Sequence, residues 1–160
     1  MPTLPQLIEE DIGELNNALQ ELLIKSDATA ALVLDKGGFI ITQCGPTGNL
    51  DLMTLAALSA ASYAATETIA MLVGETNFAS VYQQGEHSSL LVMNVDECCL
   101  LGALFKATLS VGAIKYYAGD TVKRIAVQIQ KAQQRLPGAG LDLSMLNVAD
   151  PSGMFKMKVA

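Results

Sequence analysis

The side chains that most often carry catalysis are scarce in this chain of 160 residues. His87 is its single histidine, and it stands beside Gly85 in a predicted turn, where we expect an exposed position without a chemical role. Acid–base or nucleophilic catalysis would need a carboxylate, a serine or a cysteine to converge on it, and nothing in the sequence argues for that. The carboxylates are scattered over predicted helix surfaces and turns. We therefore predict no catalytic residue and a protein that is not an enzyme.

Sequence motifs that hold phosphates, cofactors or metal ions are missing as well. The chain has no Walker A motif, no GxGxxG after a strand, no CxxC and no HExxH. The pair Gly37-Gly38 lacks the lysine and the following helix of a phosphate-binding loop, so it favours the tight turn of a hairpin. We expect no cofactor and no metal site.

The three cysteines, Cys44, Cys98 and Cys99, are an odd number, and neighbouring cysteines rarely bridge each other. We interpret all three as reduced, small apolar residues on strands, which is typical of a cytoplasmic protein. A reactive pair of thiols at Cys98 and Cys99 is the alternative.

The composition is apolar for a soluble domain. Hydrophobic residues make up 51% of the chain and charged residues only 16%, against about 25% charged residues in a typical soluble domain. Such a composition excludes a disordered chain, and the length suits one domain with a sizeable core. The excess apolar surface must be covered by a membrane, a large ligand or another protein chain.

The charge balance narrows the choice of partners. A net charge of −6 and an isoelectric point near 4.6 leave no basic surface for nucleic acid and disfavour an anionic membrane. The first residues, MPTLPQLIEEDIGE, show neither the positive nor the apolar region of a secretory signal. We expect a cytoplasmic protein that binds no nucleic acid.

A first helix is predicted near the start of the chain. Thr3 with Gln6 fits a capping box, and Pro5 suits the first turn. Apolar residues then recur at spacings of three and four, which predicts a buried stripe of Leu7, Ile8, Ile12, Leu15, Leu19 and Leu22. The acidic residues, Asp11 among them, take the other face. Gly13 predicts a close packing neighbour, because glycine inside a helix costs about 1 kcal/mol.

The remaining pattern predicts five strands, at residues 28–35, 39–44, 78–84, 88–95 and 98–105. The last two strands are apolar on both faces, which is typical of a sheet covered on both sides. A last helix follows up to residue 136, with a predicted kink at Gly119-Asp120. Because this helix is basic and the first is acidic, we expect the two to lie side by side. The alternative is that both sets of charges are merely solvated.

The stretch from Asp51 to Val73 predicts a long helix that stops at Gly74. It is apolar all round, which is typical of a helix buried on both sides. One face carries the large residues Leu55, Leu58, Ile69 and Leu72, and the opposite face carries Met53, Ala57, Ala60, Ala64 and Met71. The helix is long enough to span a bilayer, but Glu67 and several serines and threonines are poor lipid contacts. We expect no membrane insertion.

This order of elements resembles the roadblock (dynein light chain) domain family, and within it the bacterial MglB-like regulators of small GTPases. The resemblance covers roughly residues 5 to 136. It is carried by Leu32 to Phe39, by the alanine-rich helix Leu55 to Leu72 with Gly74-Glu75, by Gln83 to Glu86, and by Leu90 to Asp96 followed by Leu101-Gly102.

The resemblance implies an α/β (α+β) sandwich of the roadblock/profilin-like kind, built on a five-stranded antiparallel sheet. The implied order is α-β-β-α-β-β-β-α, with two helices on one face of the sheet and the long helix on the other. Family members dimerise by pairing the third strand across a two-fold axis, which sets the two long helices side by side. Bacterial members bind Ras-like small GTPases and regulate nucleotide hydrolysis or exchange without donating a catalytic arginine.

The arginine count agrees with that implication. Arg124 and Arg135 are the only arginines of the chain, and both fall in the predicted last helix. An arginine that assists GTP hydrolysis has to stand in an exposed, well-placed loop. We therefore expect no such arginine here.

Two interaction surfaces follow. The small-residue face of the long helix allows close approach of another backbone, with methionines as adaptable contacts. The expected partner-binding residues are Met53, Ala57, Ala60, Ala61, Ala64 and Met71. The expected dimer edge is the third strand, through Phe78, Ser80, Val81 and Tyr82, because an unpaired edge invites pairing. The alternative is that the helix pair of the dimer covers the small-residue face entirely.

We predict a single roadblock-type domain over residues 1–136, followed by an extension, 137–160, that is extended or docked. The expected function is that of a cytoplasmic, non-catalytic homodimer that binds and regulates a Ras-like small GTPase in cell polarity, motility or related signalling. Two alternatives stay open. One is a small-ligand sensor, which would need a cavity beneath the long helix, and the other is a purely structural dimeric scaffold.

Overall fold

The computed structural model describes residues 2–135, in which the elements follow the predicted order. The helices are α1 (Glu9–Ser26), α2 (Leu52–Leu72) and α3 (Val111–Gln134). The strands are β1 (Ala30–Asp35), β2 (Ile40–Cys44), β3 (Ser80–Gln84), β4 (Ser88–Asn94) and β5 (Cys99–Lys106). The predicted extension, 137–160, lies outside the described residues.

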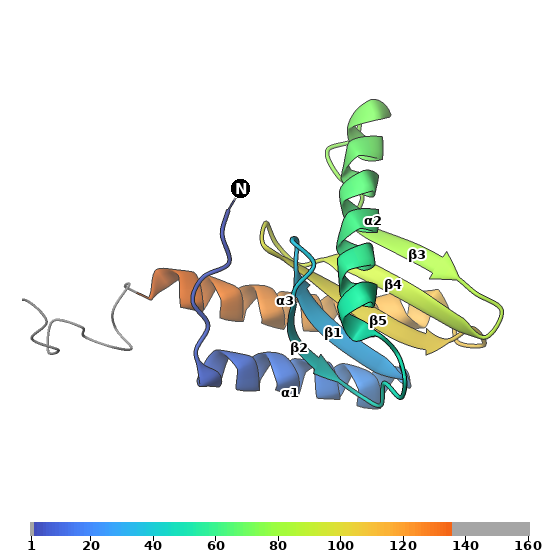
Figure 1. Cartoon of the computed structure of the whole chain (residues 1–160), viewed down its shortest axis with the longest axis horizontal. Coiled ribbons are helices and arrows are strands. Elements are labelled where there is room, and N and C mark those ends of the chain that lie inside the picture. The colour runs from blue at the N-terminus through green and yellow to red at the C-terminus, as the bar shows by residue number, and fades with distance from the viewer. Residues whose placement is uncertain (1, 136–160) are drawn as a thin grey trace, which may run out of the picture.

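The five strands form one antiparallel sheet in the order β2-β1-β5-β4-β3. Helices α1 and α3 pack together on one face of the sheet, and α2 lies on the other (Figure 1). This arrangement confirms the predicted sandwich. The central strand β5 pairs with β1 and β4, whereas β2 and β3 form the two edges.

The sheet separates two apolar layers, because successive strand residues point to opposite faces. In β1, Val33 packs toward α1 and α3, while Leu32 and Leu34 pack toward α2. The layer under α1 and α3 includes Leu15, Leu19, Leu101, Ile125 and Ile129. The layer under α2 includes Ala56, Tyr63, Val92 and Leu100. Both faces of the central strands are therefore buried, as predicted from their apolar runs.

The turn between β1 and β2 is pressed against α2. Gly38 has a φ of +93°, and a Cβ atom added to it would lie 2.8 Å from the Cα of Ala57. The Phe39 amide donates to Asp35 Oδ1 at 2.9 Å, and the Gly38 amide donates to the Asp35 carbonyl at 3.0 Å. Only glycine fits this position, because any side chain would meet both the backbone strain and the helix.

The start of α1 differs from the prediction. The helix begins at Glu9, so the capping box predicted at Thr3 and Gln6 is wrong. Pro5 disfavours helical backbone at the residue before it. The cap is supplied instead by Asp11, whose Oδ2 accepts the Ile8 amide at 2.8 Å.

Asp11 is fully buried, although the sequence pattern placed it on the solvent face of α1. Its carboxylate accepts hydrogen bonds from Gln128 Nε2 at 2.7 Å and from both terminal nitrogens of Arg135 at 2.9 and 3.0 Å. The Arg135 guanidinium and these hydrogen bonds hold the pKa of Asp11 well below its usual range. This cluster ties the first turn of α1 to the end of α3.

Two expectations about helix glycines are wrong. A Cβ atom added to Gly13 would meet nothing within 4 Å, so no close neighbour explains this glycine. Helix α3 runs from Val111 to Gln134 without a break at the predicted kink, Gly119-Asp120. In both helices the burial of the neighbouring apolar stripe outweighs the low helix propensity of a single glycine.

Gly13→Ala is expected to raise the free energy of unfolding by about 1 kcal/mol, because alanine favours the helix and has free space at this position. Chemical denaturation of both proteins measures the difference. Gly38→Ala is the matched contrast, since the same substitution at a positive φ against Ala57 should destabilise the fold. A destabilised Gly13→Ala variant would contradict this account.

Candidate interaction surface

Helix α2 is fixed to the sheet along one side. It begins after Asp51, whose Oδ1 accepts the Thr54 amide at 3.1 Å, and it stops before Gly74, which has a φ of +79°. Its buried residues are Ala56, Ser59, Ala60, Tyr63 and Ala70. Small side chains dominate this side, so the helix can approach the sheet closely.

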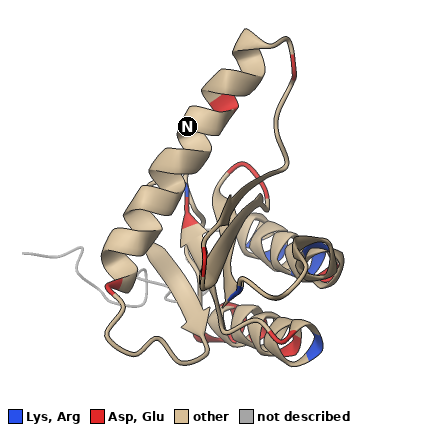
Figure 2. Cartoon of the chain, turned by 90° about the vertical axis from the view of Figure 1, so that its right-hand side faces the viewer, with Lys and Arg blue, Asp and Glu red and all other residues tan. Residues whose placement is uncertain are grey.

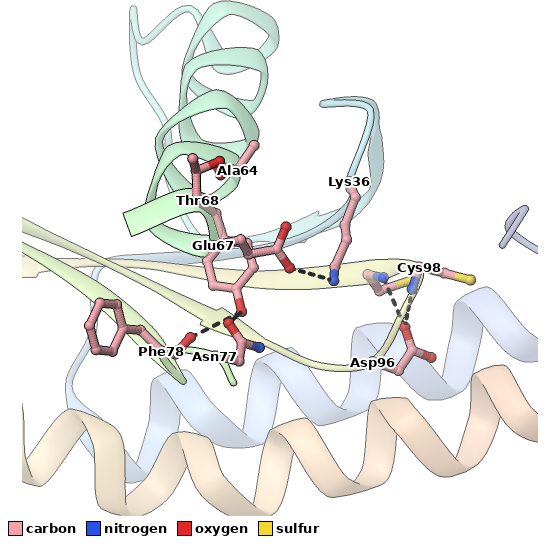
Figure 3. A network of polar contacts seen from close by, with 10 residues as sticks. Lys36, Ala64, Glu67, Thr68, Asn77, Phe78, Asp96 and Cys98 are labelled. Carbon is pink, nitrogen blue, oxygen red and sulfur yellow. Dashed lines mark hydrogen bonds and ion pairs between the residues drawn. The ribbon is translucent and has the colours of Figure 1, made fainter. Parts of the chain in front are cut away.

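Polar contacts fix the orientation of α2 on the sheet (Figure 3). Lys36 Nζ lies 3.3 Å from Glu67 Oε1 and 5.5 Å from the centroid of the Tyr63 ring. The Tyr63 hydroxyl lies 3.1 Å from both Asn77 Oδ1 and the Phe78 carbonyl oxygen, and burial raises the pKa of this hydroxyl. These contacts connect α2 to the β1–β2 turn on one side and to the segment before β3 on the other.

Most of the large side chains on the rest of α2 are apolar and exposed. Met53 is 78% exposed, Leu58 63% and Met71 68%, and Ile69, Leu72 and Val73 are exposed as well. The last turns of α2 project beyond the sheet (Figure 1), and the helix carries few charges compared with α1 and α3 (Figure 2). Large apolar side chains exposed together on one helix are typical of a surface that contacts another molecule.

Two flanks of α2, which face opposite ways, carry exposed apolar residues. We call Met53, Ala57, Ala64 and Met71 the hairpin flank, because Ala57 contacts the β1–β2 turn. We call the half-buried Leu55 and the exposed Leu58 and Ile69 the β3 flank, because the helical repeat places them on the other side of the sheet-facing stripe. Figure 1 shows the β1–β2 turn on one side of α2 and β3 on the other.

The predicted partner residues divide between surface and core. Met53, Ala57, Ala61, Ala64 and Met71 are exposed. Ala60 is only 5% exposed and packs in the layer beneath α2, so it is not available on the surface where we expected a partner to bind. The sequence pattern could not separate the exposed from the buried residues, because a helix that is apolar all round does not indicate which side the sheet covers.

Strand β3 is an edge of the sheet, as predicted, although it begins at Ser80 and Phe78 precedes it. The Asn94 amide donates to the Ala79 carbonyl, so in antiparallel alternation the amides of Ser80, Tyr82 and Gln84 point away from β4. The side chain of Val81 packs under α2, whereas the Tyr82 ring stacks on Phe105 at 6.1 Å. The outward backbone of β3 is therefore open for pairing, and its use in a dimer remains a prediction.

The chemistry-bearing residues do not converge on these surfaces. His87 is exposed in the turn before β4, and Cys98 and Cys99 are buried free thiols whose pKa values are raised by burial. Arg124 pairs with Glu21, and Arg135 pairs with Asp11, both on the α1 and α3 side of the sheet. Within residues 2–135, no arginine therefore lies on the α2 surface.

The length and hydropathy of α2 would suit a membrane-spanning helix, and no other helix among the described residues passes that test. Core helices of soluble domains pass it as well. Here α2 packs on the sheet through the fully buried Tyr63 and carries the Lys36–Glu67 ion pair. The described fold thus uses α2 as one layer of the domain.

Known proteins resemble this chain in sequence and in fold. Residues 14–105 match the Roadblock/LC7 domain family. No curated protein sequence matches the chain. A solved structure described as MglB with tetrameric arrangement is 28% identical, with a TM-score of 0.76, and the match covers 82% of this chain and 99% of that chain.

Two further structures extend the comparison. The gliding protein MglB from Thermus thermophilus is also 28% identical, with a TM-score of 0.75 and the same 82% and 99% coverage. Profilin II from Acanthamoeba castellanii is 12% identical, with a TM-score of 0.52 over 71% of this chain and 98% of that chain, and it shares the fold alone. The family match covers more than half of the chain. This chain belongs to the Roadblock/LC7 domain family.

Proposed function

We propose that this protein is a homodimeric regulator that binds a Ras-like small GTPase and has no catalytic residue of its own. The observation that carries the proposal is the pair of exposed apolar flanks on α2, which face opposite directions from one helix. A second copy of the chain needs only one flank for its contact in the dimer, so the other flank is free to bind a different partner. The likeness to MglB structures supports a regulatory role of this kind.

The β3 flank fits the dimer. A second copy added along β3 would continue the sheet on the side of α2 that carries Leu55, Leu58 and Ile69. Its own α2 would then lie against these large residues and cover the last turns, which project beyond the sheet. Full burial of an exposed side chain of this size contributes about 1.5 to 3 kcal/mol, and the exposed parts of Leu58 and Ile69 would contribute a share of that to the dimer.

The hairpin flank fits the GTPase. It faces away from the β3 edge, so a dimer formed along β3 leaves Met53, Ala57, Ala64 and Met71 uncovered. Its alanines permit close approach of a partner backbone, and its methionines adapt to irregular surfaces. This geometry argues against the alternative in which the dimer covers the small-residue face entirely.

The proposed regulation needs no inserted catalytic group. A dimer that binds one conformation of the GTPase switch loops more tightly than the other shifts the GTPase toward that conformation. The size of the shift equals the difference between the two binding free energies. Both arginines of this chain are held in ion pairs on the opposite side of the sheet, which supports a mechanism by conformational preference.

The ligand-sensor alternative is disfavoured by the packing beneath α2. Fully buried side chains, including Tyr63, Leu34 and Leu100, fill that layer. A pocket of about 580 Å³ lies outside that layer, between the N-terminal segment, the turns at Lys36 and Cys98, and Glu67 on the flank of α2. A purely structural scaffold is the second candidate function, because dimerisation alone would cover the apolar side chains of the β3 flank.

A double substitution at the β3 edge tests the dimer. Ser80→Pro with Gln84→Pro removes two outward amides and should yield a folded monomer of 16.9 kDa, where the wild type gives about twice that mass by light scattering. The measurement is made in about 1 M salt, which screens surface charge pairs. Ser80→Ala with Gln84→Ala keeps both amides and should remain dimeric. A monomeric wild type would refute the proposed dimer.

A further inference from the structure

Phe39 is a large aromatic side chain in the β1–β2 turn that the described fold leaves 72% exposed. Its backbone is nevertheless fixed. The Phe39 amide donates to Asp35 Oδ1 at 2.9 Å, and the Asp35 amide donates to the Phe39 carbonyl oxygen at 2.9 Å. Gly38 presses the same turn against Ala57 of α2. An exposed aromatic ring on a fixed backbone has few torsions to restrain on binding, which is typical of the anchor residues of protein–protein interfaces.

The pocket of about 580 Å³ lies directly beside this ring. Gly37 lines the pocket, and a Cβ atom added to Gly37 would lie 3.6 Å from Phe39 Cδ2. The N-terminal segment forms another wall through Leu4, and Cys98 closes the pocket from the turn before β5. The Cys98 thiol donates to the Thr3 carbonyl oxygen at 3.7 Å, which holds these two walls together.

The pocket carries more negative than positive charge. Three carboxylates line it, those of Asp35, Glu67 and Glu97, against the single ammonium group of Lys36. Lys36 is already paired, because its Nζ lies 3.3 Å from Glu67 Oε1 (Figure 3). Among residues 2–135, neither Asp35 nor Glu97 has a basic side chain within 4 Å. The charge of these two carboxylates is therefore left for a cationic group from outside the domain.

The pocket is continuous with the hairpin flank of α2. Glu67 follows Ala64 by three residues and precedes Met71 by four, so the three side chains are neighbours along one side of the helix. The β1–β2 turn meets the same flank where Gly38 contacts Ala57. Because β2 forms the edge of the sheet opposite β3, a dimer formed along β3 leaves this turn uncovered.

We propose that Phe39 anchors the GTPase and that the acidic pocket beside it receives a basic side chain, a lysine or an arginine, of the same partner. The proposal rests on the proposed function and names the surface that is recognised, an apolar pocket next to a basic side chain. Lysine and arginine combine an apolar stem with a charged head, which suits walls that combine Leu4 and Cys98 with carboxylates. A small cation would leave Phe39 uncovered, which favours a protein as the occupant.

Phe39→Ala should weaken binding of a Ras-like small GTPase from the same genome at least thirtyfold, measured by isothermal titration of the dimer in about 0.1 M salt. The hydrogen bonds of Phe39 with Asp35 come from its backbone, so the melting temperature and the dimer mass should stay those of the wild type. Tyr116→Ala is the matched control. It removes an aromatic side chain that is 75% exposed on α3, across the sheet, and should leave the affinity unchanged.

Glu97→Lys tests the pocket with the same titration. It should weaken the affinity at least tenfold in about 0.1 M salt, because it opposes two cations across the contact. In about 1 M salt the loss should fall below twofold, because the charges are then screened. Glu86→Lys is the matched control, since it makes the same charge change in the exposed turn at the other end of β4 and should leave the affinity unchanged.

Three results would overturn this recognition while the proposed function stands. The first is equal GTPase affinity of the wild type and a folded Phe39→Ala dimer. The second is an equal loss for Glu97→Lys and Glu86→Lys. The third is a changed mass of Phe39→Ala, which would assign the ring to a contact between copies of the chain. A wild-type dimer that binds no Ras-like GTPase would instead overturn the proposed function and the anchor with it.

Discussion

Ala64→Arg is expected to weaken binding of a Ras-like small GTPase at least a hundredfold, which corresponds to about 2.7 kcal/mol. Ala64 is exposed at the middle of the hairpin flank, between Ala57 and Met71. A long cation at this point would block close approach of the partner and bury an unpaired charge in the contact. Isothermal titration with a Ras-like GTPase from the same genome, in its GDP and GTP-analogue forms, measures the loss.

Ala60→Arg provides a contrast on the same helix. Ala60 packs under α2 and is only 5% exposed, so the arginine would enter the core and destabilise the fold. Ala64→Arg should keep the melting temperature and the dimer mass of the wild type. Unchanged GTPase affinity in a folded Ala64→Arg dimer would show that the partner does not use the hairpin flank.

Asp11→Ala is expected to lower the free energy of unfolding by about 3 kcal/mol, because breaking a buried ion pair leaves its partners unsatisfied. The substitution removes the acceptor for Ile8, Gln128 and Arg135 together. Arg135 is partly exposed, which keeps the expected loss at the lower end of the range for buried pairs. Urea denaturation measures it. Glu14→Ala in about 1 M salt is the matched control on the same helix, with a change of about 0.5 kcal/mol or less.

The same carboxylate predicts a pH dependence of stability. The pKa of Asp11 is depressed in the folded state, so its contribution is fully present above the unfolded pKa of about 3.9. The contribution is lost as the pH falls below that value toward the folded pKa, because only the unfolded chain then gains a proton readily. Denaturation curves between pH 6 and pH 2 should therefore converge for the wild type and Asp11→Ala. A constant difference over this range would contradict the role of the Asp11 ionisation.

Much of the fold follows from local sequence patterns. The glycine pair at the first hairpin, the length of α2 up to Gly74 and the apolar runs of β4 and β5 each predict an element that the structure contains. These signals are strong because they combine periodicity with a residue that stops the element. The layer order follows as well, since doubly apolar strands need cover on both faces.

The features that the sequence did not predict depend on contacts between residues far apart in the chain. Asp11 looks like one more acidic surface residue of α1, and only its distance from Arg135 in space shows that it is a buried cap. Likewise, the apolar pattern of α2 is continuous, so the sequence could not separate Ala60 in the core from Ala64 at the surface. Which way each flank faces can be seen only from the position of the β1–β2 turn beside α2 in the folded structure.

The most direct test of the central claim is the affinity of the dimer for a Ras-like small GTPase in its two nucleotide states, measured by titration in about 1 M salt and again at low salt. We expect the wild-type dimer to bind the GTPase, at least tenfold more tightly in one nucleotide state than in the other, because regulation requires that difference. Equal affinity for both states, or no binding by a dimer of correct mass, would contradict it.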